Sequence, residues 1–394
     1  MNRLRLFGGL LMIGFVCRSA AAQTLTTLAS FNGANGSFPA AGLIADAQGN
    51  LYGTTFHGGD YMAGSVFRIG GITHSLTTVA SFNGTDGARP QAALLLDATG
   101  NLYGTTTIGG DFGWGTVFQV SATTHQITDL HSFNSADGGY PLSSLTADAN
   151  GSLYGTTYTG GGANIHGTLF SIPAGFGPLV TLVGFDGTNG QAPLAGLISA
   201  PDGNFYGTTA ANLFKLSASD HMLTPLAWFG GNFGGPPGAL IADAGGNLYG
   251  ATRLGGPSND GTIFEYVSST QSLVTLASFG GANGSQPEGG LIRDANGIFY
   301  GTTLSGGAYG DGSVFKFDPS TGVVTTLASF NGGDLTGPMG GLVFGADGNL
   351  YGTTWGGGDN GMGTVFEVSV PEPGSIGLSL LAVTVLLCRR REIA

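Results

Sequence analysis

The string Leu51-Tyr52-Gly53-Thr54-Thr55 decides the fold, because it recurs with small changes through most of the chain. Its spacings are 51, 51, 52, 43, 51 and 51 residues. The tyrosines of the seven copies are Tyr52, Tyr103, Tyr154, Tyr206, Tyr249, Tyr300 and Tyr351. Self-similarity at a period of about 40–50 residues is typical of propeller blades.

Two further strings recur in every copy. The first reads Phe-Asn-Gly-x-Asn/Asp-Gly-x-x-Pro in its fuller copies, and its phenylalanines are Phe31, Phe82, Phe133, Phe185, Phe229, Phe279 and Phe330. The second reads Gly-Thr/Ser-Val-Phe, and its phenylalanines are Phe67, Phe118, Phe170, Phe214, Phe264, Phe315 and Phe366. The fourth copy of the second string keeps only Asn212-Leu213-Phe214.

The composition excludes two broad classes of protein. The 394 residues include 75 glycines, 41% hydrophobic residues and 9% charged residues. Disorder requires low hydrophobicity and high charge, which this chain lacks. A helical protein is excluded because each interior glycine costs a helix up to about 1 kcal/mol. An all-β protein with glycines at its turns remains.

Turn signals divide each copy into four strand-like runs. In the first copy these runs are Ala41–Asp46, Asn50–Thr55, Ser65–Gly70 and Ser75–Phe82. Four short antiparallel strands make one propeller blade. The glycine after each tyrosine would weaken an ordinary strand, so we expect it to mark close backbone approach near a crowded axis.

The two ends of the array predict how the ring closes. The array begins with a run of the fourth-strand type, Thr24–Phe31, and ends with one of the third-strand type, Thr364–Ser369. Pairing between them would complete the last blade and remove open sheet edges. We therefore predict a seven-bladed β-propeller over residues 23–369, with a linear β-solenoid as the alternative.

The recurrent strings also resemble the Gloeo-Verruco ("GloVer") tandem repeat of bacterial surface proteins. The Tyr-Gly-Thr-Thr, Gly-Gly and Gly-Thr-Val-Phe elements carry the resemblance across nearly all of residues 24–369. The resemblance implies a repeat protein at a bacterial surface. It implies no catalytic residue and no ligand.

The N-terminus has the pattern of a secretory signal peptide. Arg3 and Arg5 precede an apolar run from residue 6 to residue 17, and an Ala-x-Ala site at Ala20 and Ala22 follows. We expect cleavage after Ala22, which makes residues 1–22 a signal peptide. A retained anchor is the alternative, although the apolar run is short for a membrane span.

The C-terminus, residues 370–394, resembles the PEP-CTERM sorting signal of Gram-negative bacteria. It contains a Pro-Glu-Pro box, a short apolar stretch and a basic tail, formed by Pro371, Glu372, Pro373, Arg389, Arg390 and Arg391. The resemblance implies recognition by an exosortase-type enzyme and release or transfer near the box. Residues 374–388 would rise only about 22 Å as a helix, less than the ~30 Å hydrocarbon core. We therefore expect a transient insertion in the inner membrane, with a lasting anchor as the alternative.

Charge and cysteine content limit the partners. Six of the 12 basic and two of the 24 acidic residues lie in residues 1–22 and 371–394, leaving six basic against 22 acidic residues, a net charge of −16. Such a surface repels phosphate backbones, so we expect no nucleic-acid partner. Cys17 and Cys388 both lie in the terminal segments, which excludes a disulfide or a cysteine nucleophile in the repeats.

The loops between the second and third strands carry the candidate ligand-binding residues. We expect these loops to share one face with the connections between blades, which are rich in Asn and Asp. Aromatic rings beside carboxamides and carboxylates suit a neutral sugar, such as an exopolysaccharide or another surface glycan. The alternative is ordinary turn chemistry. The candidates are Phe56, His57, Asp60, Tyr61, Asp111, Phe112, Trp114, Tyr158, His166, Tyr309, Asp311, Trp355 and Asp359.

An aspartate also recurs between the first and second strands of five copies, at Asp46, Asp97, Asp148, Asp243 and Asp294. We expect these aspartates to cap the hairpins on the opposite face. A calcium site is the weaker alternative, because no EF-hand ligand pattern is present. We therefore predict no metal site and no cofactor.

Enzymatic activity is the alternative function. Propeller lyases and lactonases use His, Glu or Asp where the inner strands end, whereas these strands here are mostly Ala, Gly, Leu and Ile. Arg89 and Glu288 are the only charges beside the recurrent prolines, and they fall in separate blades. The sequence therefore favours an exported, non-catalytic structural or glycan-binding propeller of the cell surface or matrix, with a central-channel lyase or hydrolase as the alternative.

Overall fold

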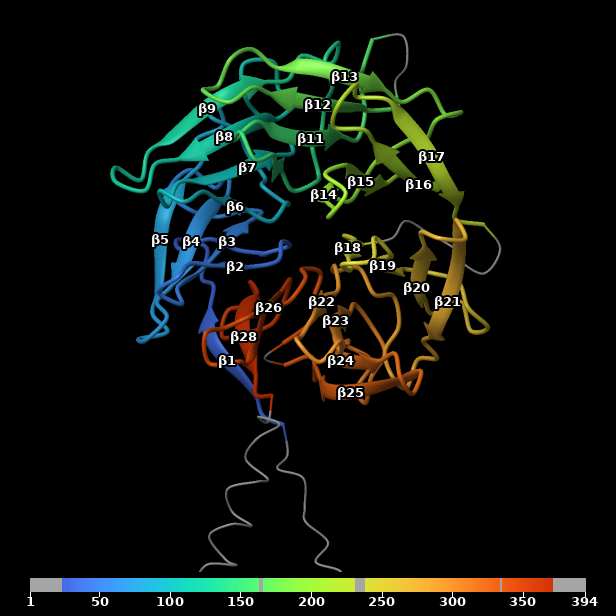
Figure 1. Cartoon of the computed structure of the whole chain (residues 1–394). Helices are drawn as coiled ribbons and strands as arrows, with labels where there is room; N and C mark the ends of the chain where they lie inside the picture. Colours follow the sequence, from blue (N-terminus) through green and yellow to red (C-terminus); the bar gives the residue numbers. More distant parts are fainter. Residues whose placement is uncertain (1–22, 163–165, 231–237, 334, 371–394) are drawn as a thin grey trace, which may run out of the picture.

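The protein forms a ring of seven β-sheets. A computed structural model describes residues 23–162, 166–230, 238–333 and 335–370. These residues form seven four-stranded antiparallel sheets that stand around a common centre (Figure 1). The predicted seven-bladed propeller is thereby confirmed. The predicted signal peptide and the predicted sorting segment, apart from Val370, lie outside the described residues.

The strands follow one order in every blade, from the centre outward. The innermost strands are β2 (Ile44–Ala45), β6 (Leu95–Leu96), β10 (Thr146–Ala147), β14 (Ile198–Ser199), β18 (Ile241–Ala242), β22 (Ile292–Arg293) and β26 (Val343–Phe344). The second strands are β3 (Leu51–Thr55), β7 (Leu102–Thr106), β11 (Leu153–Thr157), β15 (Phe205–Thr208), β19 (Leu248–Thr252), β23 (Phe299–Thr303) and β27 (Leu350–Thr354). Blades 1 to 7 are numbered here by these strands in chain order.

The outer half of each blade contains the longer strands. The third strands are β4 (Ser65–Ile69), β8 (Thr116–Val120), β12 (Thr168–Ile172), β16 (Asn212–Leu216), β20 (Thr262–Val267), β24 (Ser313–Asp318) and β28 (Thr364–Val368). The outermost strands are β5 (Leu76–Ser81), β9 (Ile127–Ser132), β13 (Val180–Gly184), β17 (Leu223–Trp228), β21 (Ser272–Ser278), β25 (Val323–Ser329) and, in blade 7, β1 (Leu25–Ser30).

The ring closes through the first strand of the chain. β1 pairs antiparallel with β28, with Leu25 opposite Val368 and Ser30 opposite Thr364. In Figure 1 the blue β1 lies beside the red β28, which brings the two described ends of the chain together. The N-terminal segment therefore supplies the outer strand that blade 7 lacks, as its sequence predicts.

The innermost strands are shorter than the sequence predicts. The expected run Ala41–Asp46 pairs only at Ile44 and Ala45. The carbonyl of Ala41 accepts a hydrogen bond from Thr353 Oγ1 of blade 7 at 2.9 Å instead of extending the sheet of blade 1. The residues before each innermost strand therefore form the wall of the central channel and join neighbouring blades.

The hydrophobic core lies between the blades. At each of the seven boundaries, the phenylalanine after one outer strand packs against the phenylalanine in the third strand of the next blade. Phe31 of blade 7 and Phe67 of blade 1 have ring centroids 5.0 Å apart, and the six other pairs are 4.8–5.7 Å apart. Edge-to-face and tilted aromatic pairs at such distances are favourable. The two recurrent phenylalanines of the sequence therefore hold adjacent blades together.

The glycine of the signature string leaves room for this phenylalanine. A Cβ atom on Gly53 would lie 2.6 Å from Phe67 Cζ and 2.8 Å from Leu43 Cδ2. The six equivalent glycines would meet their phenylalanines at 2.5–2.7 Å. The expected close backbone approach near the axis is wrong, because the atoms that exclude a side chain belong to a ring on the neighbouring strand.

The two threonines of the string have different roles. Thr55 Oγ1 exchanges a hydrogen bond with Ser65 Oγ on the next strand of its own blade at 2.8 Å. The preceding threonine reaches the neighbouring blade: Thr105 Oγ1 donates to the carbonyl of Ser143 at 3.2 Å. One threonine therefore ties strands together and the other ties blades together.

The wheel has two faces that differ in their loops. The upper face carries the loops between second and third strands and the connections between blades. The lower face carries the turns between first and second strands and between third and fourth strands. Both described ends of the chain leave at the lower face, where Ser369 N donates to the carbonyl of Thr24 at 3.1 Å and Val370 N to Asn349 Oδ1 at 3.1 Å. Within the described residues, no helix is long and apolar enough to cross a membrane.

Candidate functional site

The two loop types of the upper face are joined by backbone bridges. Ser37, in the connection into blade 1, pairs with His57 in the loop of that blade. The same bridge joins Ala88 to Ile108 and Gly139 to Thr159 in the next two blades. The connections and loops therefore lie together on one face, as the sequence predicts.

The sequence-predicted ligand residues fall into two groups on this face. Phe56, His57, Trp114 and Trp355 are half-buried and contact other aromatic rings. The others are spread over the loops of five blades: Asp60, Tyr61, Asp111, Phe112, Tyr158, His166, Tyr309, Asp311 and Asp359. Among these, Tyr61, Phe112 and Tyr309 are 64%, 59% and 67% exposed, so they stand clear of the surface.

Sequence reasoning noted only Arg89 at a further recurrent position on this face, the residue before each proline. In the described copies it has a left-handed backbone, with φ between 48° and 62°. The residues are Phe38, Arg89, Tyr140, Ala192, Gln286 and Gly337. A positive φ is uncommon for bulky residues, and such strain clusters at functional sites. The proline of the recurrent string was the only sequence signal that could have pointed to this position.

Backbone hydrogen bonds fix this position between two loops. Phe38 N donates to the carbonyl of Met362 in blade 7 at 2.7 Å, and its own carbonyl accepts from Phe56 N in blade 1 at 3.1 Å. Tyr140 makes the equivalent bonds with Trp114 and Tyr158, at 2.9 and 3.1 Å. Each pre-proline side chain is thereby held at the boundary between two blades.

The boundary between blades 7 and 1 carries an aromatic cluster. We define the blade 7–1 cluster as Phe38, Phe56, His57 and Trp355. Phe38 stacks on Trp355 at 5.3 Å and 29°, and Phe56 lies 5.5 Å from Trp355. His57 meets Phe56 edge to face at 4.5 Å. All four side chains are partly exposed, so the cluster presents ring surface to solvent.

Arg89 adds a cation beside this cluster. Its guanidinium carbon lies 5.4 Å from the centre of the Phe56 ring. Arg89 is exposed, and no ion pair joins it to any described residue. Its donors are therefore available to an acceptor that lies against the same rings.

A second aromatic cluster lies at the boundary between blades 2 and 3. We define the blade 2–3 cluster as Trp114, Tyr140 and Tyr158. The rings of Trp114 and Tyr140 are 5.1 Å apart. Gly139 leaves room for the indole, because a Cβ atom there would lie 2.7 Å from Trp114 Cε3. Tyr158 is 38% exposed, so this cluster also has ring surface facing solvent.

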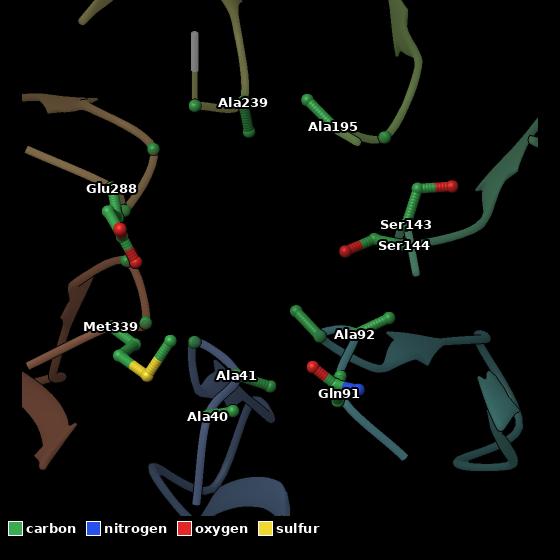
Figure 2. A pocket seen from close by; sticks show the side chains of 18 of the residues that line it. Ala40, Ala41, Gln91, Ala92, Ser143, Ser144, Ala195, Ala239, Glu288 and Met339 are labelled. Atoms are coloured by element: carbon green, nitrogen blue, oxygen red, sulfur yellow. The ribbon is translucent and has the colours of Figure 1, made fainter. Parts of the chain in front are cut away.

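The central channel opens between these loops. It has a volume of about 490 Å³ and is lined by the short segments before the innermost strands of all seven blades. Figure 2 shows small side chains, such as Ala41, Ala92 and Ala195, around its open centre. Glu288 lies on the left of this view, across the opening from Ser144. The channel can therefore hold a small molecule, but few side chains could act on it.

Glu288 and Arg253 form the ion pair of the channel wall. Arg253 Nε lies 3.0 Å from Glu288 Oε1, and the Glu288 side chain is only 19% exposed. Burial raises the pKa of the Glu288 carboxyl, while the positive charge of Arg253 acts in the opposite direction. Arg253 Nη2 also donates to Gln286 Oε1 at 3.4 Å. Arg253 therefore joins Glu288, the one acidic side chain among the described residues of the channel lining, to the pre-proline residue of blade 6.

The lower face shows what the recurrent aspartates do. Asp46 Oδ1 accepts from the backbone N–H groups of Gln48 and Asn50, and Asp46 Oδ2 accepts from the Tyr52 hydroxyl at 3.2 Å. All seven copies have this aspartate–tyrosine bond, at 2.7–3.3 Å. The hairpin-capping role is confirmed for the predicted aspartates. Sequence reasoning missed Asp202 and Asp347, which lie two residues later in the turn and reach the same tyrosine.

Hydrogen bonding changes the acidity of both partners. Burial alone would raise the pKa of Asp97, but hydrogen bonds from Asn101, Thr99 and Tyr103 outweigh burial and lower it to about 2. Burial and the charge of Asp294 raise the pKa of Tyr300 to about 12. Within residues 23–162, 166–230, 238–333 and 335–370, no three His, Cys, Asp or Glu side chains are grouped as metal ligands.

The repeat itself identifies the family. The sequence profile of the Gloeobacter/Verrucomicrobia repeat matches residues 8–212 and 211–366, which is most of the chain. The chain belongs to this repeat family. No curated protein matches it. In this member of the family, each repeat is one propeller blade.

Solved structures similar to this family member are also propellers. One is the extracellular domain of a putative hybrid two-component system from B. thetaiotaomicron, with a TM-score of 0.63 and 11% identity over 89% of this chain. This chain spans only 40% of that structure's length. Another is an oligogalacturonate lyase in complex with manganese, with a TM-score of 0.59 and 12% identity over 88% of this chain and 93% of the other. At such identities the likeness shows the fold alone.

A third solved structure is a putative 6-phosphogluconolactonase from Bacteroides fragilis. Its TM-score is 0.51, with 17% identity over 78% of this chain and 89% of the other. The three structures carry different functions in their descriptions, so the function of this repeat protein must be argued from its own surface.

Proposed function

We propose that this protein is an exported, non-catalytic propeller of the bacterial surface or extracellular matrix that binds glycans on its upper face. The blade 7–1 cluster carries this proposal. Stacked rings with partly exposed faces suit the apolar face of a sugar, and the neighbouring polar groups suit its hydroxyls. The −16 charge of residues 23–370 argues against polyanionic partners such as nucleic acids.

The two terminal segments support export. The basic start, apolar run and Ala-x-Ala site at Ala20 and Ala22 direct the chain to the secretion machinery. The Pro-Glu-Pro box at Pro371, Glu372 and Pro373 and the arginine tail direct it to an exosortase-type enzyme after a transient insertion in the inner membrane. Deleting that enzyme from the host should leave uncleaved protein in the membrane fraction, whereas an unchanged distribution would contradict the sorting proposal.

A glycan array tests the binding function. The purified protein should retain at least one surface glycan, and Trp355→Ala should weaken that binding because it removes the centre of the blade 7–1 cluster. Leu304→Ala is the matched control, since Leu304 is the equivalent residue of blade 6 and is likewise half-buried. Equal binding by wild type and both variants would contradict a role for the cluster.

The alternative function is a lyase or hydrolase with its active site in the central channel. Glu288 favours it, because a buried carboxyl with a raised pKa is typical of a general acid. Release of new sugar ends from a polysaccharide, lost in Glu288→Gln, would support this alternative. No turnover by the wild-type protein on any bound glycan would support the non-catalytic function.

A further inference from the structure

The two aromatic clusters lie on one side of the upper face. The blade 7–1 cluster and the blade 2–3 cluster are separated by the single boundary between blades 1 and 2. That boundary is polar: Arg89 lies over Phe56, and Gln91 Nε2 donates to Thr107 Oγ1 at 3.0 Å. We call the two clusters together with Arg89 and Thr107 the aromatic arc.

The other repeats act as an internal comparison. At the pre-proline position the arc has Phe38 and Tyr140, whereas blades 4, 6 and 7 have Ala192, Gln286 and Gly337. At the position after the signature string, blades 4, 5 and 6 have Ala210, Arg253 and Leu304 in place of an aromatic residue. In blades 5 and 6 a loop of the same length forms with Arg253 and Leu304 at that position, whereas the loop of blade 4 is seven residues shorter. The fold therefore does not require the rings of the arc.

The left-handed backbone that all six described copies share fixes the position of the pre-proline side chains of the arc. Phe38, Arg89 and Tyr140 have φ values of 59°, 57° and 51°, although each has a bulky side chain and precedes proline. The residue before proline ordinarily adopts an extended conformation. The left-handed conformation places each of these three side chains between two loops, where it contacts or adjoins an aromatic ring. Strain of this kind is often found at ligand-binding positions.

The charges of the arc indicate the class of ligand. Arg89 is its single cation, while Asp60, Asp111 and Asp359 lie exposed in the neighbouring loops of the same blades. A polyanion would meet these carboxylates as well as the overall negative charge. A neutral chain of sugars can stack on successive rings and bond its hydroxyls to Arg89 and Thr107 without that repulsion.

We infer that the aromatic arc binds one linear neutral polysaccharide, whose chain lies around the channel mouth and occupies both clusters at once. The inference rests on the proposed glycan-binding function and adds the substrate class and the path of the chain. Because the second cluster binds a chain that the first already holds, affinity rises with chain length until the chain spans both.

A chain-length series tests this inference. The probes are size-graded fractions of a neutral glucan, a neutral mannan and a neutral galactan, with a polyuronate as the acidic comparison. For at least one neutral series, affinity should rise on the order of 100-fold once the chain spans both clusters. Trp355→Ala and Trp114→Ala should each remove that rise, and the double variant should lose binding. Leu304→Ala should keep the whole rise.

Other outcomes separate the two proposals. If each single variant halves the number of short chains bound and leaves affinity independent of length, the clusters are separate sites and the spanning chain is wrong. Tighter binding of the polyuronate than of every neutral series overturns the neutral class. If glycans bind but neither tryptophan variant nor the double variant weakens their binding, the aromatic arc is not the binding site, although the glycan-binding function stands. Failure of every fraction to bind overturns the proposed function as well.

Discussion

Gly53 has almost no free space around it, because the ring of Phe67 fills the position of a side chain. We predict that Gly53→Ala lowers the free energy of unfolding by about 1–3 kcal/mol, since the new Cβ atom would overlap Phe67 and Leu43. Gly230→Ala is the control, because no atom of the described residues lies within 4 Å of a Cβ atom there. Urea unfolding of both variants measures the difference, and equal losses of stability would contradict the packing role of Gly53.

The aspartate–tyrosine bonds of the lower face make stability depend on pH at both extremes. The pKa of Asp97 is lower in the folded protein, so its contribution is present above about pH 4 and is lost as pH falls towards 2. The pKa of Tyr300 is higher in the folded protein, so its contribution is present below about pH 10 and is lost as pH rises towards 12.

Thermal unfolding across these two ranges tests the prediction. The wild-type midpoint should fall below pH 4 and above pH 10. In Asp97→Asn the fall below pH 4 should be less steep, because one fewer carboxylate takes up a proton. A variant as acid-sensitive as the wild type would show that the hydrogen bonds to Asp97 do not affect stability.

At the scale of strands, the pairing of β1 with β28 determines whether the wheel is closed. Thr26 and Glu367 are directly opposite each other in that pair. In a protein with Cys17 and Cys388 changed to Ser, Thr26→Cys with Glu367→Cys should form a disulfide under oxidation. The disulfide should add about 2–4 kcal/mol of stability, because it joins the two ends of a long loop.

The matched control moves one cysteine to another blade. Lys316 is the blade 6 equivalent of Glu367, so Thr26→Cys with Lys316→Cys should form no internal disulfide. Mobility on a non-reducing gel and the unfolding midpoint report both results. Cross-linking in the control, or its absence in the Thr26–Glu367 pair, would contradict the register of the closing strands.

Strand order and closure could be predicted from the sequence because the second, third and fourth strands each contain or adjoin a recurrent string. The order of strings at the two ends of the array was enough to identify the missing outer strand of blade 7. The length of the innermost strands could not be predicted. The sequence pattern predicts strand at residues such as Ala41 and Ala92. Their carbonyls instead accept hydrogen bonds from threonine hydroxyls of the preceding blade.

The candidate site could be predicted only in part, for a similar reason. The loops of the upper face were found from their position between strands, and Phe56, His57, Trp114 and Trp355 were named from residue type. The contacts of Phe38, Arg89 and Tyr140 depend on a left-handed backbone before proline, which opposes the usual preference of such residues. Which rings touch depends on how two adjacent blades pack, and the sequence alone does not give that packing.

At the scale of the whole molecule, the seven boundaries between blades share the same internal packing but differ in the side chains of their upper-face loops. Each boundary contains one pair of phenylalanines, and all of these rings are buried except Phe229, which is partly exposed. The loops above them range from aromatic to small or charged side chains. The packing between blades is therefore repeated around the whole ring, while the two aromatic clusters lie only on blades 7, 1, 2 and 3 of the described chain.

The position of the chain ends determines which face of the propeller would point away from a surface to which the protein is tethered. Thr24 and Val370 leave from the lower face, and the aromatic arc lies on the upper face. A molecule tethered through its C-terminal end would turn its aspartate-capped hairpins towards the support and its rings towards the surroundings. Neighbouring molecules tethered in this way would bind the same extracellular polysaccharide through their aromatic arcs. They would thereby fix a polysaccharide layer to the surface that holds them.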